Sequence, residues 1–119
     1  MRSKYNIDLT RWGKSGKEAR TIDGVTFDSL AEAKRWCDLR TLEKNNLVHR
    51  LERQVRYDFI INGVNCGFYK ADFRYVNDKG ETVVEDVKGM RLSNFAIKAK
   101  LMRALYGIVV QEIGGSKRR

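Results

Sequence analysis

The first strong periodic signal in the chain is a run of apolar side chains at three- and four-residue spacing between residues 29 and 46. This spacing places them on one face of an α-helix. Ser29 stands three residues before Glu32, a capping-box arrangement that opens a helix, and Asn45-Asn46 marks the expected end. The predicted buried stripe of this first helix consists of Leu30, Ala33, Trp36, Cys37, Leu39 and Leu42.

Three stretches of alternating, strand-forming residues follow at 54–61, 66–76 and 81–87. Asn62-Gly63 is a hairpin signal between the first two stretches. Asp78-Lys79-Gly80 suits a three-residue loop between the second and the third. Because short connections of this kind join antiparallel neighbours, we expect a three-stranded meander.

A second helix is expected from Ser93 or Asn94 to Gly107, because glycine favours the left-handed conformation that follows a helix. Residues 108–113 then form a last strand, which a crossover helix can place parallel to its neighbour. The predicted fold class is α/β (α+β): helix, three antiparallel strands, helix and strand, with a mixed central sheet flanked by helices. The residues expected on the inward face of the second helix are Phe95, Ile97, Leu101, Leu105 and their neighbours.

The chain length of 119 residues fits one compact domain, which we assign to residues 21–114. Residues 1–20 lack periodicity and contain several basic residues and glycines, so we expect a flexible basic arm. Residues 115–119 form a short basic tail. No apolar run is long enough to span a bilayer, so we expect no membrane partner.

The net charge is +9, from 24 lysines and arginines against 15 acidic residues, and the excess is clustered. A polyanion, nucleic acid above all, is the natural partner for such a surface, since each cation that meets a phosphate releases counterions. The plain alternative is a basic surface that only keeps the protein soluble, and for lysines on a helix a solvated face is equally compatible. The candidate DNA contacts are Arg11, Lys14, Lys17, Arg91, Lys98 and Lys100.

Cysteine and histidine usage restricts the kind of metal site that the chain can build. Cys37 and Cys66 lie far apart within regular segments, so we expect buried small side chains rather than a disulfide or half a zinc site. His49 is the single histidine. A catalytic metal would therefore be held by oxygen ligands, which favours Mg²⁺ or Mn²⁺.

The loop at 78–80 sets the register of the second and third strands. If Gly80 is left-handed, Asn77 opposes Glu81, and counting back along both strands places Asp72 directly opposite Asp86. Directly paired side chains share a face, with Cβ atoms about 5 Å apart. Two carboxylates at that separation repel each other unless a cation lies between them.

Lys88 follows Asp86 by two positions and is therefore expected on the same face of the strand. The simpler interpretation of this hairpin is a solvated charged face with cross-strand ion pairs among Asp72, Arg74, Asp86 and Lys88. Glu85 is expected on the opposite face, unless a strand bulge exchanges it with Asp86.

The order of these elements and their acidic residues resembles the PD-(D/E)XK nuclease superfamily. In that superfamily one acid ends the second strand and an acid-x-Lys triplet lies on the third, and the corresponding residues here are Asp72 and Asp86-Val87-Lys88. More narrowly, FDSLAEAK at 27–34, ADFRY at 71–75, VVEDVKG at 83–89 and the helix at 98–107 are similar to small phage and prophage proteins described as Holliday-junction-resolvase-like. Ala71 stands where the signature has proline, at a position that binds no metal.

The resemblance implies that Asp72 and Asp86 bind Mg²⁺ or Mn²⁺, with the backbone carbonyl of Val87 as a further ligand. Lys88 would orient or activate the attacking water and stabilise charge on the phosphate. The bound metal would polarise a phosphoryl oxygen and lower the pKa of its water.

Two more polar residues are candidates for the same site. Glu32 shares a helical stripe with Trp36 and Leu39 and so points inward, as the glutamate on the first helix of the superfamily does. The capping box explains a glutamate at this position equally well. Gln54 opens the first predicted strand near the same edge, where it could bind metal-bound water or phosphate or be an ordinary polar strand residue.

The resemblance and the basic charge together predict a divalent-metal-dependent DNA endonuclease, a phage-type resolvase of Holliday junctions and other branched DNA. Resolving a four-way junction needs two paired cuts, so we expect a homodimer, without a small-molecule cofactor, in the cytoplasm of a bacterial host. Two alternatives remain open. One is a nicking or general endonuclease without branch selectivity, and the other is a catalytically inactive DNA-binding protein of the same fold.

Overall fold

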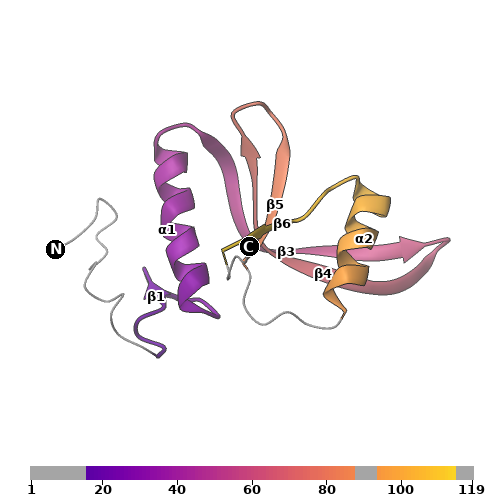
Figure 1. Cartoon of the computed structure of the whole chain (residues 1–119), viewed down its shortest axis with the longest axis horizontal. Helices are drawn as coiled ribbons and strands as arrows, with labels where there is room; N and C mark the ends of the chain where they lie inside the picture. Colours follow the sequence, from indigo (N-terminus) through magenta and orange to yellow (C-terminus); the bar gives the residue numbers. More distant parts are fainter. Residues whose placement is uncertain (1–15, 88–93, 115–119) are drawn as a thin grey trace, which may run out of the picture.

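The computed structural model describes residues 16–87 and 94–114 and shows an α+β fold with two helices and a four-stranded mixed sheet (Figure 1). In the sheet β3, β4 and β5 form an antiparallel meander, and β6 pairs in parallel with β5. The predicted order of helix, three antiparallel strands, helix and strand is therefore confirmed. The elements are β1 (Thr21–Ile22), β2 (Val25–Thr26), α1 (Leu30–Lys44), β3 (Val48–Ile61), β4 (Val64–Asn77), β5 (Thr82–Val87), α2 (Phe95–Tyr106) and β6 (Gln111–Ile113).

The ends of α1 follow from its capping residues, as predicted. Ser29 Oγ accepts a hydrogen bond from the backbone N–H of Glu32 at 3.0 Å, which satisfies one of the free donors in the first turn. Asn45 is the C-terminal cap, and Asn46 follows it with a φ of 62°. The helix buries Ala33 and Leu39 against the sheet.

The hairpin between β4 and β5 has the predicted register. Gly80 has a φ of 82° and donates its N–H to Asn77 O at 3.0 Å, while Asn77 N–H donates to Glu81 O at 2.9 Å. Beyond this loop Phe73 pairs with Glu85. Extending this register by one residue brings Asp72 and Asp86 opposite each other, and the loop chemistry correctly gives the register of the paired residues 73–76 and 82–85.

β3 is longer than the predicted 54–61 strand and bends sharply between its two halves (Figure 1). Two residues inside it, Arg50 and Gln54, have left-handed backbone conformations with φ of 57° and 56°. The pairing with β4 shifts register between His49 and Glu52. Non-glycine residues with positive φ are uncommon, and bulges of this kind bend and twist a strand.

The bend lets one pair of strands pack against both helices, so the core has two parts. The part under α1 contains Ile22, Phe27, Ala33, Leu39, Val48, Phe73 and Tyr75. The part under α2 contains Tyr57, Phe59, Tyr69, Ala71, Val84 and Met102. The two parts meet on β4, where Ala71 and Phe73 belong to different clusters and Asp72 lies between them.

Two expectations about α2 and the hairpin tip are wrong. Ile97 is 62% exposed and Leu105 is also exposed, while Met102 is the fully buried residue of α2. The inward face therefore runs through Phe95 and Met102, seven residues apart, and Ile97 falls outside it. Cys66, expected to be buried, is an exposed free thiol because it lies near the tip of the β3–β4 hairpin.

The remaining boundaries differ in smaller ways. β6 spans three residues of the predicted 108–113 strand. Residues 17–20, which the sequence assigns to the basic arm, form a turn in which Ala19 is buried and Arg20 Nε donates to Phe27 O at 2.7 Å. Residues 1–15 and the tail at 115–119 lie outside the described residues. Within the described part of the chain, neither helix has the length and apolar character of a membrane span.

Candidate functional site

Asp72 lies at the point on β4 where the two parts of the core meet, which is called the junction of the sheet below. Its Oδ2 accepts a hydrogen bond at 2.8 Å from the backbone N–H of Val87, the last residue of β5. This contact ties the carboxylate to the end of the neighbouring strand. The predicted pair of acids from β4 and β5 therefore lies where β5 ends, and the acid-x-Lys triplet begins at the same place.

Glu32 reaches this junction from α1, since its side chain is 3% exposed and points into the protein as the helical stripe predicts. Gln54 Nε2 donates to Glu32 Oε2 at 3.2 Å. Gln54 itself lies opposite Asp72, between the pairs Arg53–Phe73 and Val55–Ala71. Gln54, whose backbone is left-handed, is therefore the residue of β3 that contacts Glu32 on α1. The structure brings Glu32, Gln54 and Asp72 together.

Burial and neighbouring negative charges raise the pKa values of the Glu32 and Asp72 carboxyl groups. Burial, and then the negative charges of Asp72 and Asp28, raise the pKa of Glu32 to about 7. Burial is also the main cause that raises the pKa of Asp72 to about 6, and the charges of Asp86 and Asp28 add to it. The Val87 N–H bond and the positive charge of Arg53 oppose this rise only in part. The ionised form of both carboxyl groups is therefore less favourable at neutral pH than that of an exposed carboxyl group.

Asp86 is held from the α2 side of the sheet. Tyr69 OH donates to Asp86 Oδ1 at 3.1 Å, and burial raises the pKa of Asp86 despite this bond. Glu112, which pairs with Asp86 across the parallel β5–β6 ladder, raises that pKa further. Burial, and then the charge of Asp86, raise the pKa of the Tyr69 hydroxyl, so it stays a proton donor at neutral pH.

Sequence reasoning missed Tyr69 and Glu112. Strict alternation along β4 places Tyr69 on the other face from Asp72, and no local feature of the sequence gives the pairing of β6 with β5. The single available signal for Glu112 was its position on a strand expected to lie parallel to a neighbour. Which neighbour, and in which register, is a property of the folded sheet.

The carboxylate oxygens of Asp72 on β4 and Asp86 on β5 are the type of ligand that a hard divalent cation prefers, but they are fewer than a complete protein site has. Within residues 16–87 and 94–114, no three acidic, histidine or cysteine side chains form a group that could hold a metal ion as they stand. Mg²⁺, however, is commonly bound by one or two carboxylates together with waters and substrate phosphates. Asp72 and Asp86 are the candidates for such a pair, since the charge of Asp86 acts on the pKa of Asp72 and each carboxylate has one oxygen bound to a donor.

The basic candidates are only partly within the described residues. Lys88 and Arg91, as well as Arg11 and Lys14 of the arm, lie outside them. Lys17 and Lys100 are exposed. Lys98 is half-buried, with Nζ 5.4 Å from the centroid of the Phe68 ring. Their contacts with DNA stay a prediction, as does the metal-binding role of the Val87 carbonyl.

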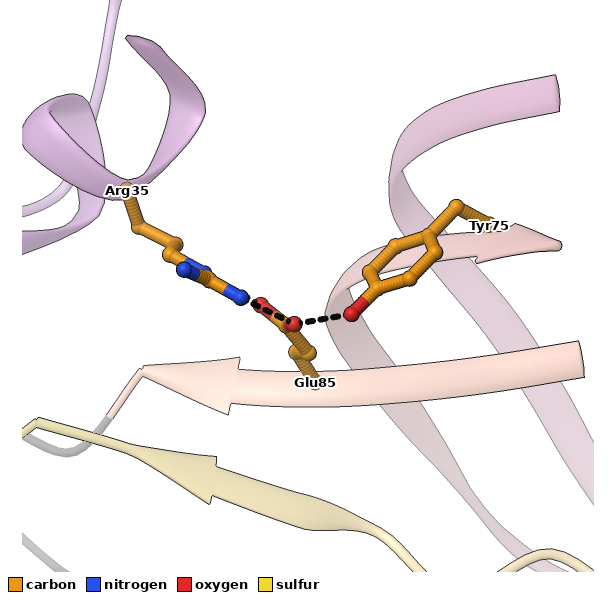
Figure 2. Close-up of polar contacts among 3 residues, drawn as sticks. All are labelled: Arg35, Tyr75 and Glu85. Atoms are coloured by element: carbon orange, nitrogen blue, oxygen red, sulfur yellow. Dashed lines mark hydrogen bonds and ion pairs between the residues drawn. The ribbon is translucent and has the colours of Figure 1, made fainter. Parts of the chain in front are cut away.

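Glu85 is buried and forms a network with Arg35 on α1 and Tyr75 on β4 (Figure 2). Arg35 donates from Nε to Oε1 at 2.8 Å and from Nη2 to Oε2 at 2.7 Å, while Tyr75 OH donates to Oε2 at 2.5 Å. Glu85 contacts Arg35 on α1 while Asp86 contacts Tyr69 in the part of the core under α2, as expected for residues on opposite faces. The pairing of β5 with β6 is unbroken at both residues, so the alternative of a bulge between them is wrong. The Glu85 carboxylate joins β5 to α1 one residue before Asp86.

The simpler interpretation of the hairpin, in which Asp72, Arg74, Asp86 and Lys88 form ion pairs with one another, does not describe Arg74, whose ion pair crosses from β4 to β3 instead. Its Nη2 bonds to Glu52 on β3 and its Nη1 donates to Tyr57 OH at 3.1 Å. Arg74 is therefore directed toward β3 rather than toward the acids on β5. Asp72 instead accepts from a backbone N–H and Asp86 from a tyrosine hydroxyl.

The raised pKa of Glu32 predicts a stability that falls with rising pH. In the folded protein this carboxyl group titrates near 7, against 4.5 for the unperturbed group, so between these values the folded state binds more protons than the unfolded state. The free energy of unfolding in EDTA should therefore decrease from pH 5 to pH 8. Glu32→Gln, which still accepts from Gln54, should remove up to about 3 kcal/mol of that decrease.

Urea denaturation of both proteins at pH 5 and pH 8 measures this effect. Glu43→Gln changes another glutamate of the same helix and should leave the pH profile of the wild type in place. A Glu32→Gln protein that is no more stable than the wild type at pH 8 would show that the carboxylate is not strained by its neighbours.

Comparisons with known proteins connect the chain with one family. A family model described as "Protein of unknown function (DUF1064)" matches residues 12–113, which include all the elements described above. Neither the curated proteins nor the solved structures contain a significant match to the chain.

Proposed function

The chain belongs to the DUF1064 family, and we propose that it is a divalent-metal-dependent DNA endonuclease whose centre contains Asp72, Asp86 and Lys88. The observation that carries this proposal is the half-buried Asp72 carboxylate at the junction of the sheet. Its pKa is raised to about 6 by burial and by neighbouring acids, and its Oδ2 is held by the N–H of Val87. A site that concentrates negative charge in this way favours a bound cation.

The arrangement of elements supports a restriction-endonuclease-like core. Asp72 lies on the second strand of the meander, within β4 rather than at its end, and Asp86-Val87 ends the third, so the acids stand on the two strands that carry them in the PD-(D/E)XK pattern. α2 then leads to a parallel strand, and Glu32 extends from the first helix toward the acids. The match is in topology and residue placement together, which is a stronger argument than a three-residue motif alone.

The residues of the chain have separate tasks in this mechanism. Asp72, Asp86 and the carbonyl of Val87 would hold Mg²⁺ or Mn²⁺, which when bound supplies Lewis-acid activation of the phosphate and of water. Tyr69 holds one oxygen of Asp86, and so orients the other. Lys88 supplies positive charge beside the phosphate. Glu32 has a pKa of about 7, suited to accepting a proton from the attacking water near neutral pH.

Branched DNA is the proposed substrate, and the proposed active form is a homodimer that makes paired cuts. The net charge of +9 supports a polyanionic substrate. Branch selectivity would arise from the spacing of two sites in a dimer and from the basic arm, rather than from the acidic residues themselves. A nicking or general endonuclease and a catalytically inactive DNA-binding protein are the outcomes against which this proposal is tested.

Incubation with matched linear duplex, flap and four-way-junction DNA in Mg²⁺ tests the proposal. We expect symmetric nicks at the junction that disappear in EDTA and in Asp86→Ala. Equal cleavage of all three substrates would identify a general endonuclease. If wild type and Asp86→Ala bind DNA but leave every substrate intact in Mg²⁺ and Mn²⁺, the protein is a DNA-binding protein and the nuclease proposal is wrong.

A further inference from the structure

The outer part of the β3–β4 hairpin presents an aromatic ring among cations. Phe68 on β4 is 38% exposed. The guanidinium carbon of Arg56 on β3 lies 3.9 Å from the centroid of its ring, and Lys98 Nζ on α2 lies 5.4 Å from it. Lys70 pairs with Arg56 across the two strands. Arg56, Phe68, Lys70 and Lys98 are called the hairpin platform below.

The surroundings of the hairpin platform are strongly basic. Residues 55–71 and 95–106 together contain five basic residues, Arg56, Lys70, Lys98, Lys100 and Arg103, and one acid, Asp58. Asp58 forms an ion pair with Arg56 at 2.8 Å, and the two segments together carry a net charge of +4. An exposed apolar ring surrounded by like charges disfavours contact with a second copy of the same surface and favours an anionic partner.

Contacts with α2 hold the hairpin in place. Tyr106 OH donates to the backbone oxygen of Asp58 at 2.7 Å, and its ring packs edge-on against Tyr57 with 4.9 Å between centroids. Met102 is fully buried under the same strands. The ring and its cations are therefore positioned before any ligand binds, which lowers the entropic cost of binding.

The hairpin platform also lies in line with the acidic residues. Phe68 precedes Asp72 by four residues on the same strand, which corresponds to roughly 13 Å along β4. Lys70 stands midway between them. A strand of nucleic acid whose phosphate lies at Asp72 could therefore continue along β4, past Lys70, to the ring of Phe68.

We propose that the hairpin platform binds unpaired nucleotides, with a base stacked on Phe68 and the backbone phosphates contacted by Arg56, Lys70 and Lys98. Aromatic rings stack on any base, and adjacent cations bind the phosphates, so the surface recognises single-stranded segments without sequence preference. This inference rests on the proposed function in taking DNA as the partner. It deepens that function by specifying DNA with unpaired bases beside the cleavage position.

Binding measured in EDTA, where no cleavage occurs, tests the proposal separately from catalysis. The probes are a fluorescein-labelled oligothymidine and a hairpin duplex of equal charge. Phe68→Ala should weaken binding of the oligothymidine about 10-fold and that of the duplex less than 2-fold, because stacking needs an open base. Phe68→Tyr keeps a ring and should bind as the wild type does, and Leu47→Ala removes another exposed apolar side chain, located between α1 and β3, as a control.

Four other outcomes of these binding measurements would overturn the proposal. If Phe68→Ala binds oligothymidine as the wild type does, the ring does not stack on bases. If its loss is equal for duplex and single strand, the surface only attracts phosphate. Unchanged DNA binding with weaker binding to phosphatidylserine vesicles would identify a membrane surface, and a change in oligomeric state alone would identify a dimer contact. A Phe68 effect on binding in a protein that cuts no DNA would retain the hairpin platform and refute the nuclease.

Discussion

Asp72→Asn is expected to reduce DNA cleavage in Mg²⁺ by about 1000-fold or more while the protein stays folded. Asparagine can still accept the Val87 N–H bond through its Oδ1, so the junction of β4 and β5 keeps its geometry. It cannot supply a negative charge to a metal ion. A loss of about 4 kcal/mol of charge stabilisation in the transition state corresponds to that factor.

Single-turnover cleavage of a labelled junction, with enzyme in excess, measures this loss without interference from product release. Asp78→Asn makes the same chemical change at the exposed turn between β4 and β5 and should cut at the wild-type rate. Thermal unfolding in EDTA should show Asp72→Asn to be at least as stable as the wild type at pH 8, since a strained carboxylate has been removed. Wild-type cleavage by Asp72→Asn would exclude this residue from the active site.

Arg35→Ala should lower the free energy of unfolding by about 3–5 kcal/mol, because it leaves a buried carboxylate without its cation. Glu85 is 1% exposed, and both of its oxygens accept hydrogen bonds from Arg35 (Figure 2). Without the guanidinium group the buried carboxylate keeps a single donor, Tyr75 OH, and must either stay charged in an apolar surrounding or take up a proton.

Chemical denaturation at pH 7 gives the size of this effect. Arg40→Ala on the same helix removes an exposed pair with Glu43 and should cost less than about 1 kcal/mol. In the double variant Arg35→Met with Glu85→Leu the unpaired charge is absent, so the loss should be smaller than for Arg35→Ala alone. Equal losses for Arg35→Ala and Arg40→Ala would mean that the network in Figure 2 does not hold β5 against α1.

The features that the sequence predicted well are those with a local physical cause. Ser29 caps α1 through an atom three residues away, and Gly80 sets the register of β4 and β5 because it adopts a left-handed conformation at low cost. From that register the neighbouring positions of Asp72 and Asp86 follow by counting. The inward direction of Glu32 likewise follows from helical periodicity.

The features that the sequence did not predict depend on packing between distant segments. Ile97 looked like a core residue, but the face of α2 that is buried is chosen by its fit to Tyr57 and Tyr69, and Met102 fills that place. The positive φ values at Arg50 and Gln54 go against local preference, and they occur in the strand that bends to pack against both helices.

Local chemistry along the chain thus specified the helix caps, the hairpin register and the pairing that places two aspartates beside each other. The bend of the sheet, the contact between Glu32 and Gln54, the bond from Tyr69 to Asp86 and the link from Arg35 to Glu85 exist only in the folded molecule. Turns and caps involve residues within a few positions of each other, so their energies are set by the neighbouring sequence. The other contacts join segments between 17 and 50 residues apart, and their geometry is set by which side chains fill the space between sheet and helices.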